Sequence, residues 1–296
     1  MKKSLLFLCG LIIVLISSCM AKNSIQTTPK REPRVSQSSE TAVEPVSLIN
    51  PDGITMSERL LVPEGYKRTH EEAGSFGAFL REYRMEPDGS PVLLYNGGKK
   101  TGHEAAVFSM FLGNKDLQQC ADSIIRIYAE YFRSIGRDEK IAFHFVSGFL
   151  CDWNTYKTGN RIVVNGNNVS WGALASPSDS DDTFESYLNT VFTYASTISL
   201  ANESKPINES EIGIGDIFIK AGSPGHVVMV ADICEKDGKK AFLLAQGYMP
   251  AQQFHVLINE AHPGDPWYYE NEITYPFHTP EYTFDKGSLM RPQYLD

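Results

Sequence analysis

The spacing of hydrophobic positions changes along the chain, from a helical period in the first half to short strands in the second. The clearest helix is predicted to begin at Asp116, with Gln119 at the capping-box position, and to end before Gly136. Its apolar stripe comprises Leu117, Ala121, Ile124, Tyr128 and Phe132. This stripe predicts a helix that packs one face on the protein core.

Two further helices and several strands are predicted before residue 200. Ser75 is the expected N-cap of a short helix, and Asp182 with Glu185 repeats the capping signature before a longer one. The core face of that longer helix would comprise Phe184, Leu188, Val191, Ala195 and Ile198. Strands are predicted at residues 91–95, 141–146 and 161–164. The apolar run 105–112 is compatible with either a helix or a strand.

After residue 210 the pattern is one of apolar runs separated by turn sequences. Residues 216–220, 227–234 and 241–246 are predicted strands, and the turn at 236–239 makes the last two a hairpin. Helices followed by an antiparallel meander indicate an α+β fold, with N-terminal helices packed on a small antiparallel sheet. We expect one globular domain over residues 50–296, with irregular structure from Pro263 onward.

The N-terminal segment has the pattern of an export signal. Lys2 and Lys3 precede an apolar run at 5–16, which is shorter than the roughly 20 residues that span a membrane. The run ends in Ser17-Ser18-Cys19, which resembles the bacterial lipobox. We therefore predict a signal peptide at 1–18, lipid on Cys19, a flexible tether at 19–49, and a lipoprotein on the periplasmic face of the outer membrane. Plain secretion with Cys19 incidental is the alternative.

Composition narrows the classes of function. The chain has 27 Lys and Arg against 36 Asp and Glu, a formal net charge of −9, and its basic residues form only doublets. Nucleic-acid binding is therefore not predicted. No two histidines have the helical spacing of zinc ligands, so neither a metal nor another cofactor is predicted.

Cysteine usage provides the candidate chemistry. Without Cys9 and Cys19, the folded part keeps Cys120, Cys151 and Cys234, an odd number that leaves at least one thiol free. Cys120 lies near a predicted helix start, where the helix dipole favours a thiolate. His226 is at the start of a predicted strand and Gln246 is at the end of the next. The chain therefore carries a cysteine, a histidine and a polar residue in the order used by thiol hydrolases.

The register of the hairpin decides whether His226 and Gln246 share a face. A loop at 236–238 places residue 228 opposite 246, which makes the two side chains diagonal neighbours about 7–8 Å apart at the backbone. A four-residue loop places them on opposite faces, unless a bulge at Gly247 restores the register.

The runs Gly215-Asp216-Ile217-Phe218-Ile219 and Gly225-His226-Val227-Val228-Met229-Val230 resemble strands of papain-like cysteine hydrolases, in particular the compact NlpC and CHAP amidases. In those enzymes a Gly-Asp strand precedes a Gly-His strand that carries the base. The resemblance implies a papain-like fold in which Cys120 attacks, His226 transfers the proton and Gln246 orients the imidazole.

Three other segments resemble a family of lipoproteins from Bacteroides-like bacteria, domain of unknown function 4846. They are Asp116-Leu117-Gln118-Gln119-Cys120-Ala121-Asp122, Ser223-Pro224-Gly225-His226 and Ala245-Gln246-Gly247-Tyr248-Met249-Pro250-Ala251-Gln252. This resemblance implies an exported, lipid-anchored single domain and supplies no activity.

Two functions remain open, together with a purely structural role in the envelope. The first is hydrolysis of amide or peptide bonds in cell-wall or other envelope peptides, with Gln119, His103, Tyr248 and Trp267 as candidate substrate contacts. The second is a non-catalytic lipoprotein of the same fold that binds glycan or peptide. Buried cysteines are common in protein cores, so Cys120 on an apolar stripe fits a packing role as well as a catalytic one.

Overall fold

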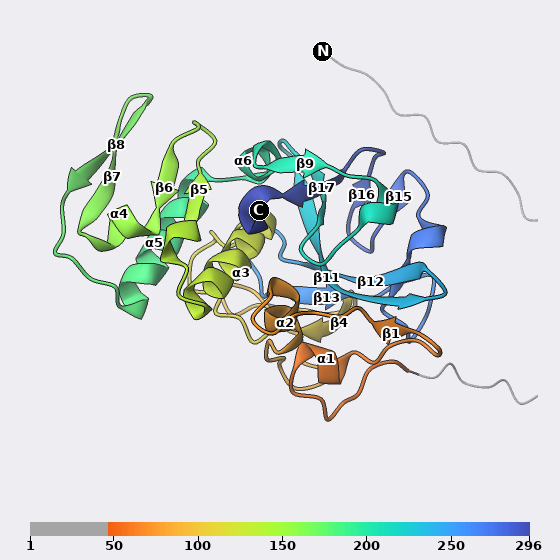
Figure 1. The fold of residues 1–296 in the computed structure, drawn as a ribbon. Helices are drawn as coiled ribbons and strands as arrows, with labels where there is room; N and C mark the ends of the chain where they lie inside the picture. The colour runs from red at the N-terminus through yellow and green to blue at the C-terminus, as the bar shows by residue number, and fades with distance from the viewer. Residues whose placement is uncertain (1–46) are drawn as a thin grey trace, which may run out of the picture. The chain divides into compact units, whose positions relative to one another are not determined.

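A computed structural model of the protein describes residues 47–296 (Figure 1). The predicted signal peptide, Cys19 and nearly all of the tether lie outside the described residues. Within 47–296, no helix is long and apolar enough to cross a membrane. The helices are α1 (Met56–Arg59), α2 (Phe76–Arg81), α3 (Cys120–Ser134), α4 (Trp153–Lys157), α5 (Asp181–Tyr194) and α6 (Thr197–Asn202).

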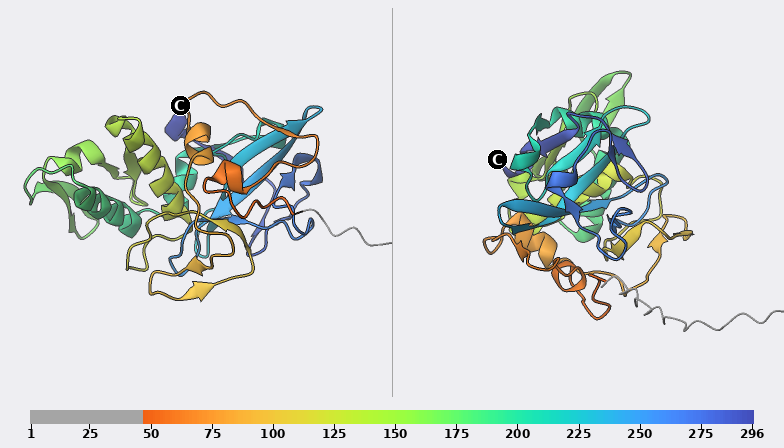
Figure 2. Two further views of the ribbon diagram at one scale, coloured as in Figure 1. Left: turned by 90° about the horizontal axis from the view of Figure 1, so that it is seen from below. Right: turned by 90° about the vertical axis from the view of Figure 1, so that its right-hand side faces the viewer.

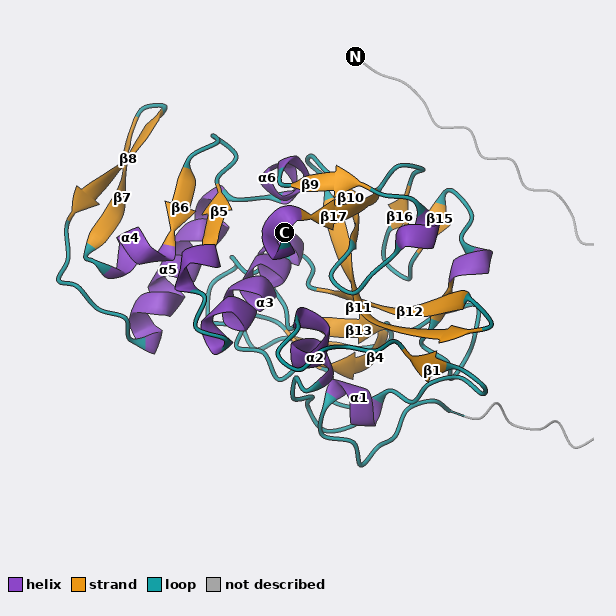
Figure 3. Ribbon diagram, in the orientation of Figure 1, coloured by secondary structure: helices purple, strands orange, loops and turns teal. Residues whose placement is uncertain are grey.

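The main element is a nine-stranded antiparallel sheet, larger than the small sheet predicted (Figure 3). Seven strands lie in the order β4 (Glu104–Val107), β13 (His255–Leu257), β12 (Lys239–Gln246), β11 (His226–Lys236), β10 (Ile217–Lys220), β17 (Leu289–Pro292) and β9 (Ser204–Pro206). The other two, β1 (Lys67–Arg68) and β14 (Tyr268–Tyr269), pair with β11 and β12 respectively.

Four two-stranded ribbons lie outside this sheet. They are β2 (Val92–Leu93) with β3 (Lys99–Lys100), β5 (Ala142–His144) with β6 (Leu150–Asp152), β7 (Asn160–Asn165) with β8 (Asn168–Ala173), and β15 (Phe277–His278) with β16 (Thr283–Phe284). The ribbons β5–β6 and β7–β8 lie with α4 and α5 on one side of α3, and the large sheet lies on the other (Figures 1 and 2).

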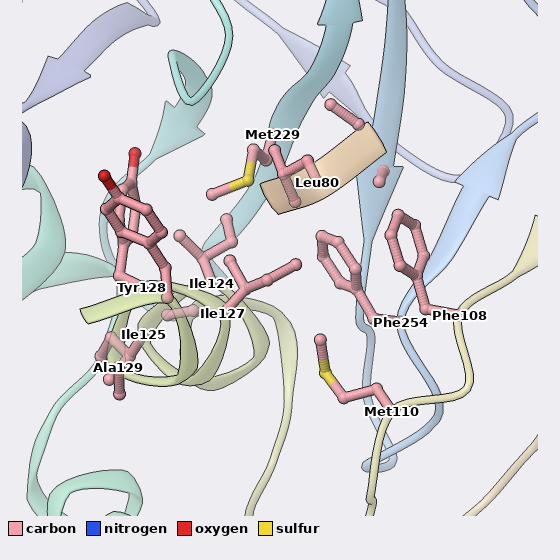
Figure 4. Close-up of a cluster of buried hydrophobic side chains, with 14 of the residues drawn as sticks. Leu80, Phe108, Met110, Ile124, Ile125, Ile127, Tyr128, Ala129, Met229 and Phe254 are labelled. Carbon is pink, nitrogen blue, oxygen red and sulfur yellow. The ribbon is translucent and has the colours of Figure 1, made fainter. Parts of the chain in front are cut away.

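The two faces of the sheet bury different hydrophobic clusters, because successive side chains of a strand point to opposite faces. On one face Val227 and Met229 of β11 join a core that includes Ile124 of α3 (Figure 4). On the other face Val228 and Val230 join a second cluster built with the C-terminal segment. These two faces matter below, because the candidate site residues are divided between them.

The hairpin β11–β12 brings His226 and Gln246 to the same face, as predicted, but through a different register. Lys236 pairs with Lys239, so the loop is the two-residue turn Asp237-Gly238, in which both φ angles are positive. That register alone would place residue 229 opposite 246. A bulge between Val230 and Asp232 shifts the pairing by one residue and places 228 opposite 246.

Helix boundaries differ from the predicted ones where polar side chains have other partners. Ser75 caps α2 as expected, accepting from the Ala78 amide at 3.1 Å. The N-cap of α5 is Ser180 rather than Asp182, and the predicted helix through Ile198 is interrupted at Ala195. There Ser196 caps α6, its side chain accepting from the Ile198 amide, so a second helix begins.

Candidate functional site

Helix α3 begins at Cys120 itself, four residues later than predicted. Gln119 is the N-cap, and its backbone N–H donates to Oδ2 of Asp122 at 3.1 Å, which satisfies an amide at the helix start. Asp116 does not cap the helix, because its Oδ1 accepts from the Ala251 amide at 2.7 Å and from Nε2 of Gln119 at 3.1 Å. The first turn of α3 is thereby tied to the loop after β12.

The Cys120 thiol lies in the wall of a cavity of about 200 Å³ and is only 7% exposed. The cavity is bounded by residues 116–122, by Ser196 and Thr197, and by the loop 222–225. Burial, and secondly the charge of Asp122, raise the pKa of Cys120 to about 12. The thiol is therefore protonated at neutral pH, in contrast to the helix-start thiolate expected from the sequence.

Backbone amides act in the opposite direction on this thiol. Hydrogen bonding by the amides of Ala121 and Val227 lowers the pKa of Cys120, against the larger effect of burial. Since Val227 follows His226 in β11, the sulfur lies beside the first residues of that strand.

Asp122 is a second unusual group in the cavity wall. Its side chain is buried, its Oδ1 has no hydrogen-bond partner within the described structure, and burial raises its pKa to about 8. The carboxyl group is therefore mainly protonated at pH 7 and carries a proton that it can donate. Its charge raises the pKa of Cys120 only once this proton is lost, at a pH above about 8.

His226 is the first residue of β11, and its ring packs on the sheet face opposite α3. Nε2 is 2.7 Å from Oε1 of Gln246, and the ring centroid is 4.6 Å from that of Tyr248. Burial lowers the pKa of His226 to about 4, although the Gln246 hydrogen bond acts to raise it. The imidazole is neutral at pH 7 and is therefore able to accept a proton.

Cys120 and His226 thus lie at the start of β11 on opposite sides of the sheet. The sulfur lies on the α3 side beside Val227, and the ring leaves the strand on the Gln246 side. No hydrogen bond joins thiol and imidazole within residues 47–296. Hydrogen bonds between catalytic groups are often long in unliganded enzymes and shorten when substrate binds.

Three residues that the sequence analysis did not select complete the polar group around Gln246. Its Nε2 donates to Oε2 of Glu281 at 2.6 Å and lies 3.5 Å from Nε2 of His255. Lys100 forms an ion pair with the other Glu281 oxygen. Glu281 comes from the segment between β15 and β16, so no local sequence pattern links it to Gln246.

The remaining predicted contacts divide into near and distant residues. Gln119 lines the cavity, and the Tyr248 ring packs at a tilt against His226, so both lie at the site. Trp267 is 0% exposed, donates from Nε1 to the Leu61 carbonyl at 2.8 Å and does not line this cavity, so its role as a ligand contact stays a prediction. His103 precedes β4 at the end that pairs with Leu257, away from the end near His255.

No three His, Cys, Asp or Glu side chains within residues 47–296 are grouped so as to hold a metal ion. Cys120, Cys151 and Cys234 are all free and buried, and only Cys120 lines the cavity described above.

The fold is one of mixed helix and sheet. Its site combines a thiol at the start of a helix with an imidazole that is hydrogen-bonded to a glutamine side chain, and both lie near one end of β11. The chain belongs to the family described as Domain of unknown function (4846), whose model matches residues 56–291. Searches of curated proteins and of solved structures found no match.

Proposed function

We propose that the protein is a papain-like cysteine hydrolase of amide or peptide bonds. The supporting observation is the strand end where the Cys120 sulfur lies beside the residue that follows His226, while Nε2 of His226 is hydrogen-bonded to Gln246 at 2.7 Å. A thiol at a helix start, an imidazole on a strand and a polar side chain on the next strand are the three groups that thiol hydrolysis uses, and all three lie near one strand end.

In the proposed reaction Cys120 attacks the carbonyl carbon of the substrate while its proton passes to Nδ1 of His226. The C–N bond then breaks, the imidazolium returns the proton to the leaving amine, and a thioester remains on Cys120. Water, deprotonated by His226, hydrolyses the thioester, releasing the acid and regenerating the thiol. The first amides of α3 have no intrahelical partner and are the candidate donors for the oxyanion.

Gln119 is the side chain proposed to assist these amides, because it lines the cavity and its Nε2 has a second hydrogen besides the one donated to Asp116. Gln118 is not available, since it is buried and accepts a hydrogen bond from Arg126. The ground state of this mechanism is a neutral thiol beside a neutral imidazole, and the proton moves only as substrate fills the cavity.

Labelling by a peptidyl epoxide, a reagent that alkylates catalytic thiols, tests the proposal. We expect modification of Cys120 in the folded protein, read by peptide mass spectrometry, and none of Cys151 or Cys234, which are also buried thiols. Cys151→Ser should label as the wild type does, and Cys120→Ser should not label. A folded protein that stays unmodified, or that is modified equally at all three thiols, contradicts the hydrolase and favours the non-catalytic glycan- or peptide-binding lipoprotein.

We also propose that the protein is anchored in the outer membrane by lipid on Cys19 and faces the periplasm, so that its substrates are cell-wall or other envelope peptides. The lipobox-like sequence before Cys19 supports this proposal. Multiple acyl chains hold a protein on a bilayer far more firmly than one does.

In a Gram-negative host, Cys19→Ser is expected to move the protein from the membrane fraction to the soluble fraction, as measured by fractionation and immunoblotting. Cys9→Ser, in the same segment, serves as the matched control and should stay with the membrane. Recovery of the wild type in the soluble fraction would refute the anchor.

A further inference from the structure

The amide of Gln246 is held by partners on three sides, and these partners determine which way it points. Its Nε2 lies 2.6 Å from Oε2 of Glu281, an oxygen that accepts hydrogen bonds when ionised. Its Oε1 lies 2.7 Å from Nε2 of His226. Because an amide has donors only on nitrogen and an acceptor only on oxygen, these two contacts constrain each other.

His255 adds a second constraint on the nitrogen side. Its Nδ1 lies 3.0 Å from the carbonyl oxygen of Gln253, which only accepts, so Nδ1 must carry the hydrogen. Burial lowers the pKa of His255, so the ring is neutral and its Nε2 has a lone pair. Nε2 of His255 is 3.5 Å from Nε2 of Gln246 and accepts the second hydrogen of that amide nitrogen.

A flipped Gln246 amide would therefore be unfavourable. It would place Oε1 against the Glu281 carboxylate and against the His255 lone pair, where no hydrogen is available. Lys100 forms an ion pair with Glu281, whose side chain is only 9% exposed, so this carboxylate has a cationic partner inside the protein. The ammonium group of Lys100 also lies 5.0 Å from the ring centroid of Tyr248, which contacts His226.

We infer that Glu281, supported by Lys100 and His255, is a positioning residue that fixes the tautomer of His226 through Gln246. With Gln246 Oε1 facing the imidazole, the hydrogen must be on Nε2 of His226, and Nδ1 keeps the lone pair. The inference rests on the proposed function, because the tautomer matters for catalysis only if Nδ1 accepts the Cys120 proton. Glu281 touches neither the thiol nor the reacting bond.

The tautomer is measured directly by proton–nitrogen NMR on the full-length protein labelled with ¹⁵N-histidine. The wild type should show His226 as a single tautomer with hydrogen on Nε2. Glu281→Met, which retains a similar shape without an acceptor, should give a mixture of both tautomers. Glu281→Gln retains an acceptor oxygen and should restore the single tautomer. Glu272→Met is the matched control, because Glu272 bonds only the surface residue His262 at 2.7 Å.

A single Nε2–H tautomer in folded Glu281→Met overturns the inference. If that variant does not fold, Gln246→Met provides the same test, and an unchanged tautomer without the amide overturns the inference equally. Epoxide labelling of wild-type Cys120 separates this result from the proposed function. Labelling without a tautomer change removes only the role of Glu281, whereas a tautomer change without labelling removes only the hydrolase.

Discussion

Replacing His226 with alanine is expected to lower the rate of peptide hydrolysis by about a hundred-fold to ten-thousand-fold, the usual contribution of a general base. Without the imidazole, the Cys120 proton has no nearby acceptor, and burial raises the pKa of that thiol to about 12. The assay measures cleavage of peptides released from Gram-negative cell wall. Mass spectrometry detects the two products, whose summed mass exceeds that of the peptide by one water.

The pH dependence gives this prediction a second readout. Because burial lowers the pKa of His226 to about 4, the imidazole is unprotonated throughout the neutral range. The wild-type rate should therefore change little between about pH 6 and 9 and fall as the pH drops toward 4. His226→Ala should show a rate that rises with pH throughout, because hydroxide must then take the thiol proton.

His262→Ala is the matched control for this experiment. His262 is a partly exposed histidine paired with Glu272, and its loss should leave the rate within about two-fold of wild type. If His226→Ala cleaves as fast as His262→Ala, His226 is not the base.

Asp232→Ala is expected to have the largest effect on stability, lowering the free energy of unfolding by about 3–5 kcal/mol. The Asp232 side chain is 0% exposed and binds two cations, with Nε of Arg68 at 2.6 Å and Nε of Arg81 at 2.8 Å. It also accepts from the Ile233 amide at 2.8 Å, next to the bulge in β11. Removing it leaves two half-buried guanidinium groups without their carboxylate.

Chemical denaturation measures this effect, with Glu139→Gln as the matched control. Glu139 also pairs with an arginine, Arg137, but its side chain is 56% exposed, and such surface pairs contribute far less to stability than buried ones. Equal losses for the two variants would show that burial of the Asp232 cluster adds nothing to stability.

The strands were predictable from sequence, but the register that matters for the site was not. Alternation and turn chemistry predicted the β11–β12 hairpin, and the structure confirms that His226 and Gln246 share a face. The sequence offered a longer loop or a bulge at Gly247 as ways to achieve this. The molecule uses a two-residue turn and a bulge between Val230 and Asp232, next to the buried ion pairs of Asp232 with Arg68 and Arg81.

The start of α3 was misplaced because a capping signature is only a local signal. Asp116 and Gln119 have the right spacing for a capping box, but Asp116 binds the Ala251 amide, 135 residues further along the chain. Competition from such a distant backbone donor cannot be seen in a short window. The helix therefore begins at Cys120, which places the thiol in the first turn rather than beyond it.

The polar group around Gln246 was the least predictable part of the site. Gln246 and His226 lie in strong strand patterns, whereas Glu281 lies in a segment rich in proline and aromatic residues. The chain from Pro263 onward was predicted to be irregular structure. Its residues instead supply Glu281 to the site and β17 to the large sheet.

The position of β17 inside the sheet has a consequence for how the protein is made. Residues 289–292 pair with β10 on one side and with β9 on the other, so β9 has no sheet partner until they arrive. A ribosome must therefore have synthesised nearly all 296 residues before this edge of the sheet is able to close. Shortening the chain at residue 288 would leave β9 without its partner in the sheet.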